Sequence, residues 1–182
     1  AVNTVVNVGG RLAGYNTDYD GLTYLARHAG IPFDGRKVVI FGSGGTAKTA
    51  TAAAKDGGAR EVVIVSRHGE NNYGNLERQA DAEVLINATP LGMAPNINAM
   101  PADPAGFPQC AGVIDVVYNP LTTRFVSRAG ELGIPTTTGL PMLAAQAARA
   151  AELFSGKTIG EDAILQCTAA VDRMQRDILL IG

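Results

Sequence analysis

The sequence predicts an α/β fold in which helices cover both faces of an open, mostly parallel sheet. Short apolar runs of strand length alternate with helical stretches along the 182 residues, an order that is typical of parallel sheets. One continuous apolar run, residues 37–41, leads directly into the glycine-rich turn Gly42–Gly45. The composition agrees, because 22 glycines and a 5% share of aromatic residues suit tight turns and close packing of helices on strands.

The predicted strands are short apolar runs that end at turn residues. The first two flank Gly9-Gly10, a pair that favours a tight hairpin turn. The later ones are mostly continuous apolar runs, which are typical of parallel strands buried on both faces. Together the predicted strands span residues 5–8, 11–15, 37–41, 62–65, 84–86, 113–117 and 134–137.

The predicted helices carry apolar residues at spacings of three and four and end at glycines. Asn16-Thr17-Asp18 offers cap residues for the first helix, and Thr158 with Glu161 resembles a capping box for the last. The helices are expected from Asp18 to Gly30, from the glycine-rich turn to Gly57, and over residues 123–132, 142–154 and 158–180. The polar segment 68–79 and the proline-rich segment 93–109 are expected to be loops.

Charge, cysteine and hydropathy patterns exclude several classes of protein. The formal net charge of −2 argues against a nucleic-acid partner, and no apolar stretch is long enough to predict a membrane span. Two cysteines and two histidines in unrelated positions predict neither a disulfide framework nor a metal site. Because no signal-peptide pattern is present, a cytoplasmic location is expected. Ala1 lies at the start of an extended run, and we expect that the N-terminal part of a longer protein is missing.

Gly42-x-Gly44-x-x-Ala47 matches the pattern G-x-G-x-x-G/A of Rossmann-like, dinucleotide-binding folds. Gly42 permits the tight turn, Gly44 lets the backbone approach a pyrophosphate, and Ala47 allows the helix to pack closely on the strand. The free N–H groups of the helix start then favour the anion. An ordinary glycine-rich turn is the alternative, but the strand before the turn and the helix after it favour a dinucleotide site.

The end of the next strand distinguishes NAD from NADP. NAD sites place an acidic residue there, about 20 residues after the glycines, whereas this chain has Ser66-Arg67-His68. Arg67 can pair with the 2′-phosphate of NADP; the alternative is a solvated surface arginine. Ligands bind beyond the carboxyl ends of parallel strands. The candidate residues at those ends are Gly42, Ser66, Arg67, Asn87, Ala88, Thr89, Tyr118, Asn119 and Gly139.

Four further polar residues are candidates for a structural or a functional role. Asp18 is either a helix cap or a catalytic carboxylate. Asn3 and Gln146 are isolated amides to which the pattern alone assigns no role. Asp115 interrupts an apolar strand, and we expect it to be buried, hydrogen-bonded and structural.

Several strings, taken in order along the chain, resemble the shikimate dehydrogenase family. No single string is specific, but the set spans almost the whole chain. The strings are Ala1-Val2-Asn3-Thr4-Val5, Gly14-Tyr15-Asn16-Thr17-Asp18, Gly42-Ser43-Gly44-Gly45-Thr46-Ala47, Ile86-Asn87-Ala88-Thr89-Pro90-Leu91-Gly92-Met93, Asp115-Val116-Val117-Tyr118-Asn119-Pro120 and Gly139-Leu140-Pro141-Met142-Leu143-Ala144-Ala145-Gln146-Ala147-Ala148.

The resemblance implies hydride transfer between NADP and shikimate, with 3-dehydroshikimate as the oxidised product. It implies that Asn3, Asp18 and Gln146 hydrogen-bond the substrate, that Tyr118 lines the pocket, and that Asp18 also takes part in proton transfer. The residues implied to hold NADP are Gly42, Ser43, Gly44, Gly45, Thr46, Ala47, Ser66, Arg67, Asn87, Thr89 and Gly139. Oxidation of an alcohol needs a group that takes the hydroxyl proton while hydride leaves.

The chain also departs from the family pattern. The family's catalytic lysine and its Ser-x-Ser carboxylate-binding motif precede the Asn3 string and are absent from these residues. Only 19 residues separate Arg67 from Asn87, so we expect that the family's usual edge strand is missing. Ser66 and Thr138 stand where the family more often has other residue types.

The resemblance divides the chain into three parts. Residues 1–20 are expected to be a remnant of the substrate domain with the start of a linker helix, 21–156 the NADP-binding domain, and 157–182 a helix that returns toward the substrate domain. The last helix carries an apolar stripe of Ile164, Cys167, Val171, Met174 and Ile178, which predicts either a homodimer or an exposed apolar patch.

Three functions remain open at this point. The leading hypothesis is an NADP-dependent shikimate dehydrogenase whose present 182 residues bind the cofactor but are inactive alone. The alternatives are a quinate/shikimate dehydrogenase that uses NAD and a dinucleotide-binding module without catalytic activity.

Overall fold

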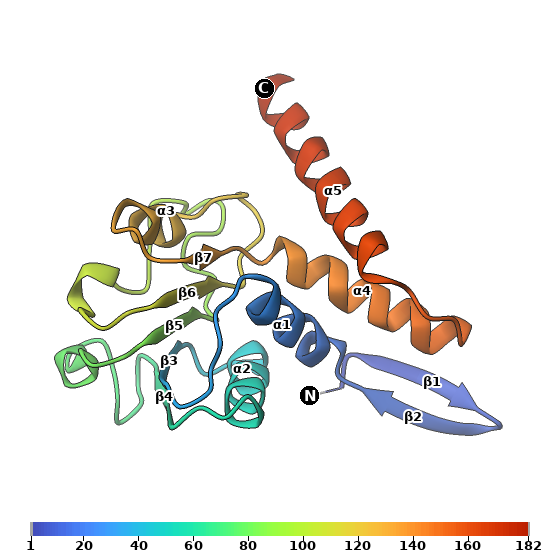
Figure 1. Cartoon of the computed structure of the whole chain (residues 1–182), viewed down its shortest axis with the longest axis horizontal. Helices are drawn as coiled ribbons and strands as arrows, with labels where there is room; N and C mark the ends of the chain where they lie inside the picture. The colour runs from blue at the N-terminus through green and yellow to red at the C-terminus, as the bar shows by residue number, and fades with distance from the viewer. Residues whose placement is uncertain (1, 182) are drawn as a thin grey trace.

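The computed structural model of the protein describes residues 2–181, with the side chains of residues 2–177. Its centre is a five-stranded sheet with the strand order β4-β3-β5-β6-β7, in which all neighbours are parallel (Figure 1). The sheet consists of β3 (Lys37–Phe41), β4 (Glu61–Val65), β5 (Val84–Asn87), β6 (Gly112–Asp115) and β7 (Thr136–Thr137). The expected α/β fold with an open parallel sheet is confirmed.

Within residues 2–181, five α-helices and two short 3₁₀ helices accompany the strands. The α-helices are α1 (Thr17–His28), α2 (Gly45–Asp56), α3 (Arg124–Glu131), α4 (Leu140–Ser155) and α5 (Glu161–Ile181), and the 3₁₀ helices are η1 (Leu76–Gln79) and η2 (Pro104–Gly106). The boundary expected between residues 20 and 21 falls inside α1.

The chain reverses its direction of travel across the sheet at β3. From β3 it passes to β4 on one side and then crosses to β5 on the other. Phe41 at the end of β3 is level with both Val65 and Asn87, so the three segments that follow these strands start together. Such a reversal point is where open α/β sheets bind ligands.

Alternate residues of β3 face two separate hydrophobic clusters. Val38 and Ile40 face the cluster that contains residues of α1, α2 and α4. Val39 and Phe41 face the cluster that contains α3 residues and Phe107 of the irregular segment before β6. Helices therefore cover both faces of the sheet, three on one face and one on the other (Figure 1).

Two strands are shorter than predicted. β6 ends at Asp115, because the carboxylate of this residue turns back to accept the backbone N–H of Val117 at 3.0 Å. β7 is a two-residue edge strand, since Pro135 offers no N–H for a ladder. Between β4 and β5 the chain forms η1 and turns but no strand, so the expected absence of a further edge strand is confirmed.

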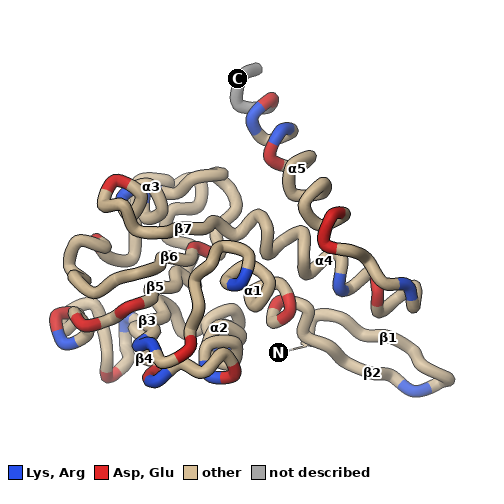
Figure 2. Tube along the Cα trace, viewed as in Figure 1, with Lys and Arg blue, Asp and Glu red and all other residues tan. Residues whose placement is uncertain are grey.

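Two elements extend away from the sheet (Figure 1). Strands β1 (Thr4–Val8) and β2 (Arg11–Tyr15) form an antiparallel hairpin, with positive φ angles of 57° and 86° at the predicted turn Gly9-Gly10. The side chains of Val5, Val8 and Leu12 are open to solvent, and Leu12 is 77% exposed. Figure 2 shows that the hairpin carries little charge, with Arg11 near its tip.

Helix α5 packs on α4 near its start and then projects outward (Figure 1). Of the predicted apolar stripe, Cys167 is exposed, Met174 is 63% exposed, and Ile164 and Val171 are half-buried. The side chain of Ile178 lies outside the described residues. Within residues 2–181, helices of the length and hydropathy that a membrane span requires are not found.

Candidate functional site

A cavity of about 500 Å³ opens at the reversal point of the sheet. It is formed by the segments that follow β3, β4 and β5, whose carboxyl ends lie side by side. Six of the predicted cofactor residues line it: Gly42, Ser43, Gly44, Ser66, Arg67 and Thr89. Ala88, another candidate residue at the end of this strand, also lines the cavity, together with Tyr73, Pro90 and Leu91, to which the sequence assigned no role.

Gly42 is required by the backbone at this place. Its φ angle is +114°, and a Cβ atom there would lie 2.8 Å from the carbonyl oxygen of Ala88. Its N–H donates to the carbonyl of Val65 at 2.8 Å. The glycine therefore lies where the ends of three strands meet, and it lets the turn after β3 closely approach the segment that follows β5.

The start of α2 fits a phosphate group. Its N-cap is Gly44, no side chain caps the helix, and no acidic residue lies in the first turn. A Cβ atom at Gly44 or Gly45 would meet no atom within 4 Å, so the backbone N–H groups are accessible. Uncapped N–H groups and the helix dipole attract anions. Ala47 is fully buried in the core, so it sets the packing of α2 on the sheet and has no surface to offer a ligand.

Arg67 provides the positive charge of the cavity. It is exposed and forms no ion pair with the carboxylates of the described residues. Tyr73 lies near it, and its ring stacks on Phe41 with 6.4 Å between ring centroids and 14° between planes. Partial burial raises the pKa of Tyr73, while the charge of Arg67 lowers it by a smaller amount.

Asn87 belongs to a buried polar network under the cavity. It is fully buried, and its Nδ2 donates to Asp115 Oδ1 at 2.9 Å and to the carbonyl of Leu91 at 3.0 Å. Its Oδ1 accepts the hydroxyl of Thr89 at 2.6 Å. Asn87 thus shapes the turn that presents Thr89 to the cavity, and its own amide groups are already occupied.

Asp115 is the centre of this network, as the sequence predicted. It is fully buried and also accepts the Thr123 hydroxyl at 2.6 Å. Burial raises the pKa of Asp115 to about 6, against the lowering effect of hydrogen bonds from Thr123, Val117 and Asn87. The network therefore connects the Thr89 turn with the segment that carries Tyr118.

A second cavity of about 180 Å³ lies beside the first. It brings together the predicted substrate residues Asp18, Tyr118 and Gln146 with the predicted cofactor residues Thr46 and Gly139. They come from the start of α1, the segment after β6, the body of α4 and the start of α2. The two cavities thus share the α2 start as a common border.

Asn3 is the one predicted substrate residue that does not line the smaller cavity, but hydrogen bonds connect Asn3 to this cavity through Thr17. Its Oδ1 accepts the backbone N–H of Thr17 at 2.9 Å and the hydroxyl of Thr17 at 3.2 Å. The same hydroxyl lies 3.3 Å from Oε1 of Gln146. Thr17 is 1% exposed, so a buried threonine joins two of the predicted substrate residues.

The cap interpretation of Asp18 is wrong. The helix begins at Thr17 with Asn16 at the N-cap position, and Asn16 makes no side-chain cap bond. Asn3 supplies that bond from the hairpin, because its carboxamide oxygen accepts the N–H of Thr17. Asp18 lies in the first turn and is half-buried in the second cavity.

Two glycines set the position of α4. A Cβ atom on Gly21 of α1 would lie 2.8 Å from the carbonyl oxygen of Met142 and 3.0 Å from Cβ of Gln146. A Cβ atom on Gly139 would overlap the carbonyl oxygen of Val116. Gly21 thus allows α1 and α4 to approach closely, and Gly139 allows α4 to begin against the end of β6.

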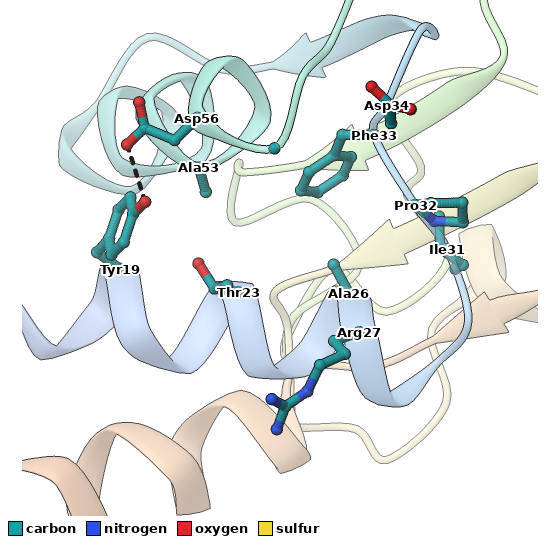
Figure 3. A pocket seen from close by; sticks show the side chains of 11 residues that line it. Tyr19, Thr23, Ala26, Arg27, Ile31, Pro32, Phe33, Asp34, Ala53 and Asp56 are labelled. Atoms are coloured by element: carbon teal, nitrogen blue, oxygen red, sulfur yellow. Dashed lines mark hydrogen bonds between the residues drawn. The ribbon is translucent and has the colours of Figure 1, made fainter.

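A third hollow, of about 310 Å³, lies between α1, α2 and the segment before β3 (Figure 3). Tyr19 donates to Asp56 across it at 2.8 Å. None of the predicted site residues lines this hollow. Among residues 2–181, no group of His, Cys, Asp and Glu side chains has the arrangement of a metal site.

Comparison with known proteins shows that this chain is similar to shikimate dehydrogenases. No family model matches the sequence. The NADP(+)-dependent shikimate dehydrogenase of Clostridium perfringens is 35% identical over 169 residues, which cover 86% of this chain and 62% of the relative. The chain therefore spans less than two thirds of the length of this curated relative.

Solved structures give the same result. A chorismate mutase/shikimate 5-dehydrogenase fusion protein from Clostridium acetobutylicum superposes with a TM-score of 0.91 at 28% identity, over 97% of this chain and 68% of that one. Shikimate 5-dehydrogenase from Thermus thermophilus, in complex with NADP(H) and shikimate, superposes with a TM-score of 0.81 at 34% identity, over 93% of this chain and 68% of that one. The chain belongs to the shikimate dehydrogenase family.

Proposed function

We propose that this chain is the NADP-binding part of an enzyme that interconverts shikimate and 3-dehydroshikimate, and that it contributes one side of the substrate pocket. This proposal rests on the border that the two cavities share. The uncapped start of α2 separates a cavity that contains Arg67 from one that contains Asp18, Tyr118 and Gln146. A nucleotide site beside a polar pocket suits a dehydrogenase.

The larger cavity supports NADP as the cofactor. The backbone N–H groups after Gly44 are free to bind a pyrophosphate. Arg67 supplies an unpaired cation for a 2′-phosphate, and no acidic residue lines the cavity to repel it. When bound, the dinucleotide supplies or accepts the hydride.

Six predicted cofactor residues line this cavity, Thr46 and Gly139 line the smaller one, Gly45 belongs to the accessible helix start, and Ala47 and Asn87 support the site from the core.

The smaller cavity supports a polyhydroxylated substrate. Asp18 offers a carboxylate that can accept a hydroxyl proton, and Gln146 and Asn3 offer amides that can bind neighbouring hydroxyls. Thr17 orients both amides, because its backbone N–H donates to Asn3 Oδ1 while its hydroxyl can donate to Gln146 Oε1. Fixed hydrogen-bond partners select one hydroxyl among several because an unmatched buried partner costs free energy.

We further propose that these 182 residues bind NADP(H) without turning over shikimate. The lysine and the two serines that the family resemblance implies are not among them. Loss of a positioned proton-transfer group costs about 10²–10⁴ in rate, and poor orientation of the substrate costs about 10²-fold more. A homodimer and a cytoplasmic location stay predictions.

The test is calorimetric titration of NADPH and NADH into the chain and into Arg67→Ala. We expect the unaltered chain to prefer NADPH by about tenfold or more, because a charged hydrogen bond contributes about 1.5–3 kcal/mol. Arg67→Ala should lose this preference and bind NADH as before. Arg11→Ala, which removes one positive charge from the hairpin tip, is the matched control and should leave both affinities unchanged. Equal or tighter binding of NADH by the unaltered chain would favour the NAD-dependent alternative.

A further inference from the structure

The segment between β4 and β5 folds back over the carboxyl ends of the strands. In place of a strand it forms a turn held by its own amides. Ser66 N–H donates to the carbonyl of Asn71 at 3.1 Å, Asn75 Nδ2 donates to the carbonyl of Glu70 at 2.9 Å, and Asn72 N–H donates to Asn75 Oδ1 at 2.9 Å. These bonds fix the shape of the turn, and Tyr73 lies within it.

Tyr73 has two different surroundings. Its ring stacks on Phe41, which is fully buried, while the residue remains 37% exposed. The exposed part lines the larger cavity together with Arg67. Its hydroxyl forms no hydrogen bond with the described residues. The ring is therefore supported from below by the core and open toward the cavity.

The turn after β5 adds the apolar residues Pro90 and Leu91 to the lining of the cavity. The larger cavity thus has an aromatic residue, apolar residues and a cation in one place. A planar base that carries a phosphate on its sugar matches these features, because base–aromatic stacking is favourable and an arginine pairs with phosphate.

Building on the proposed function, we infer that Tyr73 is a cofactor-binding residue whose ring forms the wall against which the adenine of the dinucleotide lies, next to Arg67. The turn that stands in place of an edge strand thereby becomes part of the nucleotide site. The competing explanation is that Tyr73 only covers Phe41 and contributes to stability alone.

The test uses adenosine 2′,5′-bisphosphate as the probe, since it contains the adenine and the sugar phosphate without the nicotinamide. We compare the unaltered chain with Tyr73→Leu and Tyr73→Phe by calorimetric titration. We expect about tenfold weaker binding for Tyr73→Leu and unchanged binding for Tyr73→Phe, which keeps the ring. Tyr19→Leu removes a tyrosine from the separate hollow of Figure 3 and is the matched control, with unchanged binding expected.

A second readout separates contact from stability. The chain has no Trp and five Tyr, so its ultraviolet fluorescence comes from tyrosine. Adenine stacked on Tyr73 should quench part of this emission, and Tyr73→Phe should lose that part of the quenching while it keeps its affinity. The unfolding temperature of each variant without ligand shows how much Tyr73 contributes to stability alone.

The outcomes are distinct. If the unaltered chain binds the probe and all three variants bind it equally, Tyr73 only covers Phe41; the inference is wrong and the proposed function stands. If Tyr73→Phe binds as weakly as Tyr73→Leu, the ring is not the contact and the inference is also wrong. If the unaltered chain binds neither the probe nor NADPH, the proposed function fails and this inference fails with it.

Discussion

The two cavities at the carboxyl edge of the sheet are built in different ways. The larger cavity is made by short segments that each follow a strand, and its shape depends on backbone positions such as Gly42. The smaller cavity depends on side chains from remote parts of the chain, since Thr17 and Gln146 are 129 positions apart. A local sequence pattern can therefore specify the first, whereas the second requires that two helices pack correctly.

Gly139→Ala should reduce the stability of the protein most, because it changes the start of α4 at the border of the smaller cavity. A Cβ atom there would overlap the backbone of Val116, and neither the strand end nor the helix start can yield cheaply. We expect the free energy of unfolding, measured with urea, to fall by about 3 kcal/mol or more. A midpoint equal to that of the unaltered chain would show that α4 does not begin this close to β6.

The next effect concerns Asp115, which supports both cavities. Burial raises its pKa from 3.8 to about 6 in the folded protein, so the folded chain keeps this proton to a higher pH than the unfolded chain. The protonated form stabilises the fold below about pH 4, and this contribution is lost as the pH rises through about 6. The difference corresponds to about 3 kcal/mol.

Asp115→Asn isolates this contribution, because the other acids are common to both proteins. An amide can keep the bonds to Asn87, Val117 and Thr123 by donating to the threonine hydroxyl in place of accepting from it. Urea unfolding across this pH range should show the unaltered chain losing stability relative to Asp115→Asn as the pH increases. A relative gain over the same range contradicts the buried, desolvated carboxylate.

A third substitution should reduce the stability less, and its effect should be confined to the smaller cavity. Gly21→Ala places a methyl group against Met142 and Gln146, and we expect a loss of about 1–3 kcal/mol of stability. NADPH affinity should stay unchanged. Gly130→Ala is the control, since this exposed helical glycine has open space around it and should gain about 0.5–1 kcal/mol. Equal effects of the two substitutions would mean that α1 and α4 are not in close contact.

The sequence predicted those features that depend on neighbouring residues. The Gly9-Gly10 hairpin, the turn Gly42–Gly45 and the buried role of Asp115 are such features, and the structure confirms them. Strand ends were less predictable: beyond β6 the N–H group of Val117 donates to the Asp115 carboxylate and not to a neighbouring strand, which no apolar pattern reveals.

The features that sequence analysis missed all depend on remote contacts. Asn3 caps α1 from the hairpin, so the pattern around Asp18 pointed to the wrong residue. Asn87 was predicted to contact the cofactor, but its hydrogen bonds to Asp115 and Thr89 hold its side chain in the core. Tyr73 gave no signal because its neighbours are polar turn residues, and only the fold brings it to Phe41.

We propose that the nucleotide site is complete within this chain, whereas the substrate site is not. The most direct measurement is a pair of calorimetric titrations on the unaltered chain, first with NADPH and then with shikimate added to the NADPH-saturated protein. We predict one NADPH bound per chain and shikimate binding at least about 100-fold weaker, because none of the described residues that line the smaller cavity is a lysine, an arginine or a serine that could bind its carboxylate. Shikimate binding as tight as that of NADPH, or no binding of NADPH, would contradict this difference between the two sites.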